Sequence, residues 1–171
     1  MREERRFYGK YRGTVVNNID PERRARLLCL VPDVLSLTPS GWCECCAPLA
    51  GPVGTTMGVH LVPPIGAGVW VEFEQGDPNY PIWSGCRFGA LPDAASQGLP
   101  ISPSIILETA AKNQIVISDL PGPTGGIMLK STTGVSLIIN DTGIYLQNGL
   151  GAKLTLIGPS IDMNNQALTV T

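Results

Sequence analysis

Residues 135–170 read VSLIINDTGIYLQNGLGAKLTLIGPSIDMNNQALTV, and their pattern decides the fold. Apolar residues alternate with polar ones over runs of about five residues, which is the period of a β-strand with one buried face. Gly134, Gly143, Gly151 and Gly158 punctuate these runs at spacings of 9, 8 and 7 residues and mark tight turns. The stretch therefore predicts a ladder of short strands.

Strands this short bury too little apolar surface to be stable alone, so they must stack on one another. A β-helix made by one chain usually needs roughly twenty residues for each circuit, more than twice the length of these units. The simplest closure is three identical chains, each forming one side of a triangular prism. The residues predicted to face its core are Val135, Leu137, Ile139, Ile144, Leu146, Leu154, Leu156, Ile161, Met163, Leu168 and Val170.

The first half of the chain carries short strands separated by clusters of turn-forming residues. We expect strands at 7–19, 25–32, 41–48, 68–75 and 81–86, with a loop at 50–58. Five short strands without helical periodicity favour an OB-type barrel. The predicted fold is all-β, with an OB-fold collar domain over 1–89, a linker over 90–104 and a trimeric intertwined β-helix needle over 105–171.

Few residues could carry chemistry. Cys43 and Cys45 share a strand face that Cys46 does not, which is poor metal-ligand geometry, and buried cysteine packs as a small apolar residue. His60 is the only histidine, and no P-loop, zinc-protease or serine-nucleophile motif accompanies it. We therefore expect no catalytic residue, no metal site, no cofactor and no enzymatic activity.

Charge is distributed unevenly along the chain. Residues 1–26 hold eight basic and four acidic residues, so they could meet an acidic partner or nucleic acid, or simply form a solvated arm. Residues 27–100 hold one basic and six acidic residues, and this balance opposes binding to phosphates. The aromatic residues that could otherwise stack on bases are Trp42, Trp70, Phe73, Tyr80 and Trp83. Core and subunit packing is the use we expect for them.

In three stretches, residues 8–27, 50–58 and 64–85, the chain resembles the baseplate assembly protein V family, which belongs to the spike proteins of contractile phage tails and type VI secretion. Residues 64–85 read PIGAGVWVEFEQGDPNYPIWSG, and residues 8–27 resemble the opening strands of the family's barrel. The loop at 50–58 resembles its central glycine-rich loop. The matching motif residues are Gly66, Gly68, Val69, Val71, Phe73, Glu74, Gly76, Asp77, Pro78, Pro81 and Gly85.

The resemblance implies a homotrimer with a collar of three barrels and a needle. It implies a baseplate hub protein at the collar end, which would face Arg5, Arg6, Lys10 and Arg12. A PAAR-type tip protein would cap the other end, and the needle would puncture the target cell envelope when the sheath contracts. The chain lacks a secretory signal and an apolar run long enough to span a membrane, so we expect assembly in the bacterial cytoplasm as part of a phage tail-like particle.

The favoured function is thus the central spike of a contractile tail or injection system. One alternative is an OB-fold protein that binds single-stranded nucleic acid and oligomerises through its β tail. A second alternative is a small hydrolase that acts on the cell envelope, for which the sequence nominates no acid–base pair.

Overall fold

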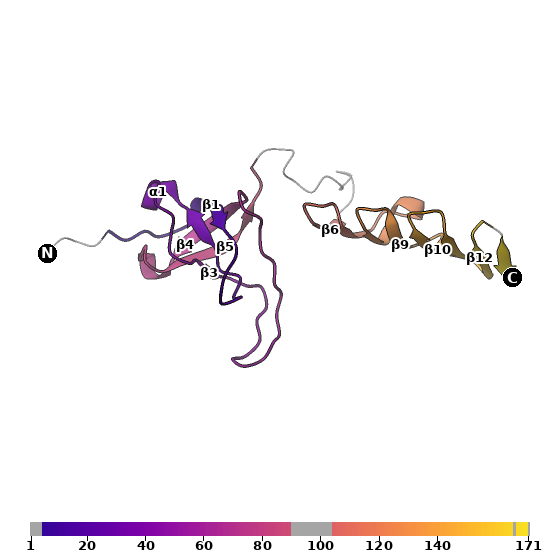
Figure 1. Ribbon diagram of the computed structural model, residues 1–171, viewed down its shortest axis with the longest axis horizontal. Coiled ribbons are helices and arrows are strands. Elements are labelled where there is room, and N and C mark those ends of the chain that lie inside the picture. The colour runs from indigo at the N-terminus through magenta and orange to yellow at the C-terminus, as the bar shows by residue number, and fades with distance from the viewer. Residues whose placement is uncertain (1–4, 90–103, 166, 171) are drawn as a thin grey trace. The chain divides into compact units, whose positions relative to one another are not determined.

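The structure is a computed structural model that describes residues 5–89, 104–165 and 167–170. The chain divides into two compact units, Met1–Leu91 and Pro92–Thr171. Both are built from strands, and the single α-helix of the described residues, α1 (Pro32–Leu35), is four residues long (Figure 1). The all-β prediction is therefore confirmed. The predicted linker at 90–104 lies outside the described residues except for Ser104, which begins a strand.

The first unit is an OB-like barrel formed by a five-stranded sheet. Its strands are β1 (Tyr11–Asn17), β2 (Leu28–Leu30), β3 (Glu44–Cys45), β4 (Gly68–Phe73) and β5 (Pro81–Arg87). They are arranged in the order β2-β1-β4-β5-β3, with β3 parallel to β5 and the other pairs antiparallel. All five fall within or beside the predicted ranges, but the first four are shorter. Helix α1 was not predicted; Pro32 suits its first turn because that position needs no backbone N–H donor.

The barrel has a complete apolar core. Alternation along β4 turns Val69, Val71 and Phe73 inward and leaves Trp70 and Glu72 half-exposed on the other side. The residues at most 6% exposed in this core are Val15, Leu27, Cys29, Val31, Cys43, Val69, Val71, Phe73 and Trp83. A core that closes within one chain lets the barrel fold without a partner.

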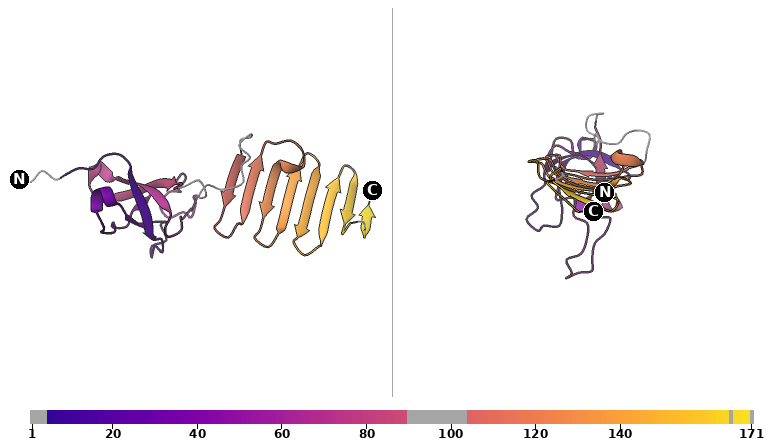
Figure 2. Two further views of the ribbon diagram at one scale, coloured as in Figure 1. Left: turned by 90° about the horizontal axis from the view of Figure 1, so that it is seen from above. Right: turned by 90° about the vertical axis from the view of Figure 1, so that its right-hand side faces the viewer.

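The second unit is one antiparallel sheet in which each strand pairs with the next along the chain (Figure 2). Its strands are β6 (Ser104–Glu108), β7 (Gln114–Ser118), β8 (Gly126–Lys130), β9 (Val135–Asn140), β10 (Gly143–Asn148), β11 (Lys153–Ile157), β12 (Ser160–Met163) and β13 (Leu168–Val170). The predicted ladder of short strands is confirmed for β9 to β13. The corners stack closely: Gly149 has φ +72°, and a Cβ there would lie 2.5 Å from the Thr133 carbonyl oxygen.

Candidate assembly surfaces

Pairing along the second sheet places apolar residues from its strands in two rows on one face. Residues directly opposite each other in an antiparallel ladder project to the same side. The first row is Ile105, Ile117, Ile127, Ile139, Ile144, Leu156 and Ile161. The second row is Leu107, Ile115, Leu129, Leu137, Leu146, Leu154, Met163 and Leu168. We call these two rows the isoleucine–leucine face.

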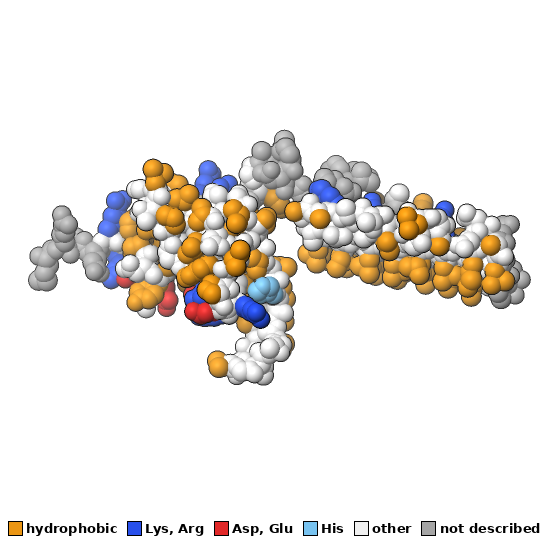
Figure 3. Space-filling model, in the orientation of Figure 1, with side chains coloured by type: hydrophobic (Ala, Val, Ile, Leu, Met, Phe, Trp, Pro, Cys, Tyr) orange, Lys and Arg blue, Asp and Glu red, His pale blue; other side chains and the backbone are white. Residues whose placement is uncertain are grey.

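The isoleucine–leucine face is open to solvent in a single chain. Exposed fractions of its side chains include 62% for Ile105, 44% for Ile127 and 47% for Leu146. Figure 3 shows the resulting continuous band of apolar atoms along one side of the sheet unit. A contiguous apolar surface of this extent marks a site of association.

The predicted core residues lie together on this face. Nine of the eleven occupy the two rows, and Val135 lies two residues before Leu137 on the same strand face, opposite Asn148. Val170 is paired with Ile161 in the ladder. The sequence analysis missed the contributions of β6, β7 and β8, which are Ile105, Leu107, Ile115, Ile117, Ile127 and Leu129.

The opposite face of the sheet becomes more polar along the chain. Its middle row begins with Ile106, Val116, Met128 and Ile138, then continues with Tyr145, Thr155 and Asp162. Beside this row, the Gln147 amide donates a hydrogen bond to Ser136 Oγ over 2.9 Å, and Ser136 is only 5% exposed. The sheet unit thus satisfies its polar groups on one side and leaves its apolar groups uncovered on the other.

Most of the motif residues lie in β4, the 3₁₀ turn η1 (Glu74–Gly76) and β5, while Gly66, Asp77 and Pro78 lie in the segments beside them. In this turn Gly76 has φ +78°, and a Cβ there would lie 3.0 Å from the Tyr8 ring. Its carbonyl accepts a 2.8 Å hydrogen bond from the Phe7 N–H. Glycine at position 76 therefore lets the N-terminal arm lie against the turn. This close approach explains why the motif has glycine at this position.

The next motif residue, Asp77, fixes both the turn and the arm. Its carboxylate accepts a 3.0 Å hydrogen bond from the Asn79 N–H and lies 3.3 Å from Arg6 Nη1. Pro81 is buried at the start of β5. The Gly85 backbone, with φ +150°, lies opposite Trp70 beside a bulge in the β4–β5 pairing.

The four residues predicted to face a hub differ in what they contact. Arg6 pairs with Asp77, and Lys10 Nζ lies 2.9 Å from Glu72 Oε1 and 2.8 Å from Ser84 Oγ. The hydrogen bond from Lys10 also lowers the pKa of Glu72. Arg5 lies over the Phe7 ring, 5.2 Å from its centroid, and is exposed. Arg12 is exposed on β1.

Comparison with known proteins agrees with the division into barrel and sheet. The model of the "Type VI secretion system/phage-baseplate injector OB domain" matches residues 11–88, and that of the "Phage baseplate V C-terminal trimerisation domain" matches residues 104–169. The chain belongs to the phage baseplate V family. It is therefore a component of a phage or type VI secretion baseplate spike, and its trimerisation domain makes it a homotrimer. No curated protein matches it.

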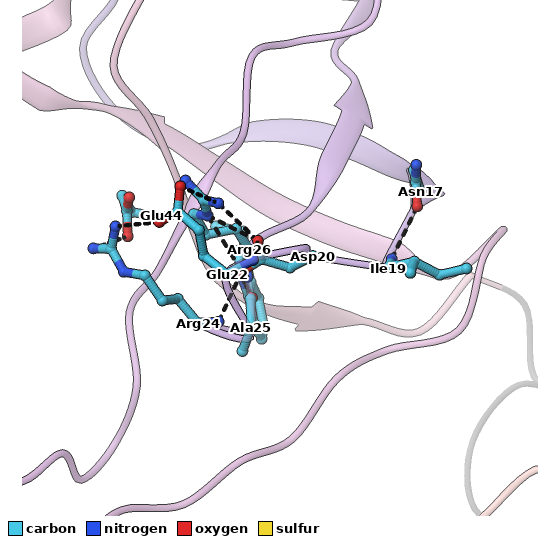
Figure 4. Close-up of polar contacts among 9 residues, drawn as sticks. Asn17, Ile19, Asp20, Glu22, Arg24, Ala25, Arg26 and Glu44 are labelled. Atoms are coloured by element: carbon cyan, nitrogen blue, oxygen red, sulfur yellow. Dashed lines mark hydrogen bonds and ion pairs between the residues drawn. The ribbon is translucent and has the colours of Figure 1, made fainter. Parts of the chain in front are cut away.

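This baseplate V chain also contains a polar site that the sequence analysis missed. The Asp20 carboxylate, whose side chain is 3% exposed, lies 2.7 Å from Arg26 Nη2 and accepts hydrogen bonds from the backbone of Glu22, Arg24 and Arg26 (Figure 4). The Arg26 guanidinium foremost, and these N–H groups, hold the pKa of Asp20 well below its usual range, against the opposing effect of burial. Arg26 is thus part of a closed turn rather than a solvated basic arm.

Positive φ angles close the turn around Asp20. Arg23 has φ +57° and Ala25 has φ +59°, and the Ala25 carbonyl accepts a 2.9 Å hydrogen bond from the Trp83 indole. The Asp20–Arg26 ion pair joins residues six positions apart in the sequence. At this spacing, side chains do not meet within a single helix or a single strand. Two features of the sequence could have indicated this ion pair. They are the turn-forming motif Asn-Asn-x-Asp-Pro at 17–21 and the opposite charges of Asp20 and Arg26.

The candidate chemical residues do not gather at one site in the part of the chain that the structure describes. Cys43 is buried beside Ser40, with 3.2 Å between Sγ and Oγ, whereas Cys46 and His60 are exposed. The contact with Cys43 and burial raise the pKa of the Cys29 thiol. Within the described residues, no group of His, Cys, Asp or Glu side chains could hold a metal ion, and no helix is both long and apolar enough to cross a bilayer.

Four of the five aromatic residues considered for base stacking are buried or half-buried in the barrel. Trp83 and Phe73 are 6% exposed, and the Trp83 indole N–H donates a hydrogen bond to the Ala25 carbonyl. The Trp42 ring lies 5.5 Å from the Arg26 guanidinium carbon. Trp70 is half-buried, and Tyr80 is 62% exposed. Of these five rings, only that of Tyr80 is exposed, whereas stacking on successive bases needs several exposed rings.

Proposed function

We propose that this homotrimer is the central spike of a contractile tail or injection system, which punctures the target envelope when the sheath contracts. The observation that carries the proposal is the uninterrupted isoleucine–leucine face on a sheet of eight strands. Three such faces meeting on a common axis would form a dry apolar core. Each sheet would supply one side of a triangular prism.

The dimensions suit a needle. Eight strands spaced about 4.8 Å apart give a shaft of roughly 35 Å, and packed sheets lie about 10 Å apart, so the cross-section is small. The inherent twist of each sheet would wind the three sheets around each other, which is the intertwined β-helix of the proposal. Hydrogen bonds between all neighbouring strands resist bending, so the needle transmits force. This function needs no catalysis and no cofactor.

The barrels would anchor the needle to the baseplate hub. The exposed cations of the N-terminal arm and β1 suit an acidic hub surface; they are Arg5, Arg6, Lys10 and Arg12. At the other end, β13 is the edge strand of the described sheet, and a PAAR-type tip protein would cover that edge. Assembly would occur in the bacterial cytoplasm as part of a phage tail-like particle.

Replacing Leu146 by Asp in the gene of a producing strain tests the proposal. The charge would be forced into the apolar core, so we expect particles that lack an intact spike and do not injure target cells. The control is Gln147→Asp, which places the same charge on the opposite face beside Lys153. Electron microscopy counts the particles, and survival of target cells measures injection. Leu146→Asp particles that injure targets as often as the unmodified ones would refute the spike function.

A further inference from the structure

Between β3 and β4 the barrel carries a hairpin that belongs to neither sheet. The Gly51 N–H donates to the Met57 carbonyl over 2.7 Å, and the Val59 N–H donates to the Leu49 carbonyl over 3.0 Å. A bridge between Ala50 and Gly58 lies between these bonds. We call residues 49–59 the 49–59 hairpin. Figure 1 shows it extending away from the rest of the barrel.

The tip of the hairpin is also ordered by its own contacts. The Thr55 N–H and hydroxyl both donate to the Pro52 carbonyl, over 3.1 Å and 2.7 Å. Gly51 is needed where the two arms approach, because a Cβ there would lie 2.8 Å from the Met57 Cβ. The hairpin therefore has a preformed shape, which lowers the entropy lost on binding.

The 49–59 hairpin presents apolar side chains and no charge. Val53 at its tip is fully exposed, Met57 is 60% exposed and Leu49 is 47% exposed. The chain from 45 to 71 contains no Asp, Glu, Lys or Arg, although the whole chain has 26 of them. In Figure 3 the hairpin projects from the barrel as a mainly uncharged surface with apolar atoms at its tip. An ordered, uncharged and exposed projection is suited to burial in a permanent interface.

Homotrimer formation provides a partner for this surface. The segment 90–103 joins each barrel to its trimerisation sheet, and 14 residues can span at most about 50 Å. The three barrels are thereby held at an effective concentration that favours contact among them. An uncharged hairpin offers an outside protein no electrostatic steering, whereas a tethered copy of the same chain needs none.

We propose that the 49–59 hairpin packs onto the barrel of the neighbouring copy, so that three identical contacts close a ring. Such a contact joins two different surfaces of the same chain, and a three-fold axis closes it. The receiving surface would be the remaining exposed apolar side chains of the barrel. These are Tyr8, Ile19, Leu37, Leu61, Ile65, Tyr80 and Phe88. The inference rests on the homotrimer and adds a second interface to the one formed by the sheets.

Photo-crosslinking of the full chain tests this interface. Val53 is replaced by p-benzoylphenylalanine, which an exposed tip accommodates without disturbing the core. After irradiation and boiling in detergent, we expect covalent bands at two and three times 18.1 kDa. The matched control carries the same probe at Asp33, which is exposed on α1 outside the hairpin, and should give only background.

Two further measurements separate the possible outcomes. Light scattering before irradiation reports the trimer, and mass spectrometry identifies the crosslinked peptides. Crosslinks from position 53 to peptides within residues 5–89 of another copy support the proposal. An intact trimer with no crosslink above the Asp33 control, or with crosslinks only to residues 104–170, overturns it and leaves the spike function standing. A monomer would contradict both the ring and the trimer on which the spike function depends.

Discussion

The barrel and the sheet unit differ in which side chains they bury within a single chain. Among the described residues, the buried apolar side chains all lie in the barrel, between Val15 and Trp83. In the sheet unit the buried side chains are polar, Gln114 and Ser136, while Ile105 and Leu146 remain 62% and 47% exposed. The barrel is thus a complete core, and the sheet is one side of a core that other copies complete.

Because of this difference, the barrel is stabilised within one chain, whereas the sheet unit is stabilised by assembly. Apolar burial contributes about 25 cal/mol for each Å² removed from water, so the sheets gain most of their stability only on association. All three tryptophans, Trp42, Trp70 and Trp83, lie in the barrel, so tryptophan fluorescence reports the barrel alone. The oligomeric mass reports the sheets. The two regions can therefore be perturbed and observed separately.

The largest expected effect is loss of the trimer in Leu137→Asp. Leu137 lies in the second row of the isoleucine–leucine face, opposite both Leu129 and Leu146. Three carboxylates would have to enter one apolar core, at a cost of several kcal/mol each. Light scattering should show a monomer, while tryptophan fluorescence should still report a folded barrel.

The opposite face supplies the control for that variant. In Thr155→Lys the new charge lies opposite Asp162 and should leave the trimer intact. If Leu137→Asp stayed trimeric, or if Thr155→Lys were as disruptive, the assignment of the two faces would be wrong.

The second-largest effect is expected for a substitution in the barrel core. Leu27 is 0% exposed, so Leu27→Ala should lower the free energy of unfolding of the barrel by about 2–5 kcal/mol. Denaturant unfolding followed by tryptophan fluorescence measures this loss, and light scattering should still find a trimer. Leu37→Ala is the control, because Leu37 is 87% exposed and its truncation should cost less than about 0.5 kcal/mol. Dissociation of the Leu27→Ala trimer would show that the two regions are coupled.

Asp20 predicts how barrel stability depends on pH. Its pKa is lower in the folded chain than the ordinary value of 3.8, so its stabilising effect is complete above that value and is lost as pH falls toward the folded pKa. Asp20→Asn should lower the melting temperature of the barrel at pH 7, and the difference from the unmodified chain should shrink at pH 3. Melting curves followed by tryptophan fluorescence at both pH values check this. A difference of equal size at both would mean that the charge of Asp20 does not matter.

The smallest effect is expected at Lys10. Its ion pair with Glu72 is exposed, with 52% and 39% of the two side chains accessible, so Lys10→Gln should cost at most about 1 kcal/mol. The loss should decrease further in high salt because exposed charges are screened. Denaturant unfolding at low and high salt measures both values. A loss as large as that of Leu27→Ala would indicate a structural role that the contacts of Lys10 do not explain.

The sequence predicted the core-facing residues of strands that alternate clearly between apolar and polar residues, and it missed those of β6, β7 and β8, whose two faces are both apolar. Polar Thr155 separates Leu154 from Leu156, and Asp162 separates Ile161 from Met163, so the common face of these apolar residues could be predicted. Ile105-Ile106-Leu107 in β6 is continuously apolar because Ile106 lies on the opposite, half-buried face, and such a run gives no period. Similar runs in β7 and β8 explain the other omissions.

In the barrel, turn residues and the family motif located the strands, but they did not predict tertiary contacts. The Asp20–Arg26 pair depends on positive φ at Arg23 and Ala25, residue types that do not favour that conformation. The contact between Phe7 and Gly76 joins residues 69 positions apart in the sequence, and only the folded chain brings them together. The predicted hub-facing residues likewise differ in their contacts for reasons that the sequence does not contain.

The most direct test of the central claim, that the isoleucine–leucine face is completed by two further copies, is the mass of the native full chain. Light scattering measures it in solution, and a detergent gel run without heating tests how firmly the copies are held. The account predicts a particle of three times 18.1 kDa that resists the detergent. A stable monomer of 18.1 kDa with a folded sheet would contradict it.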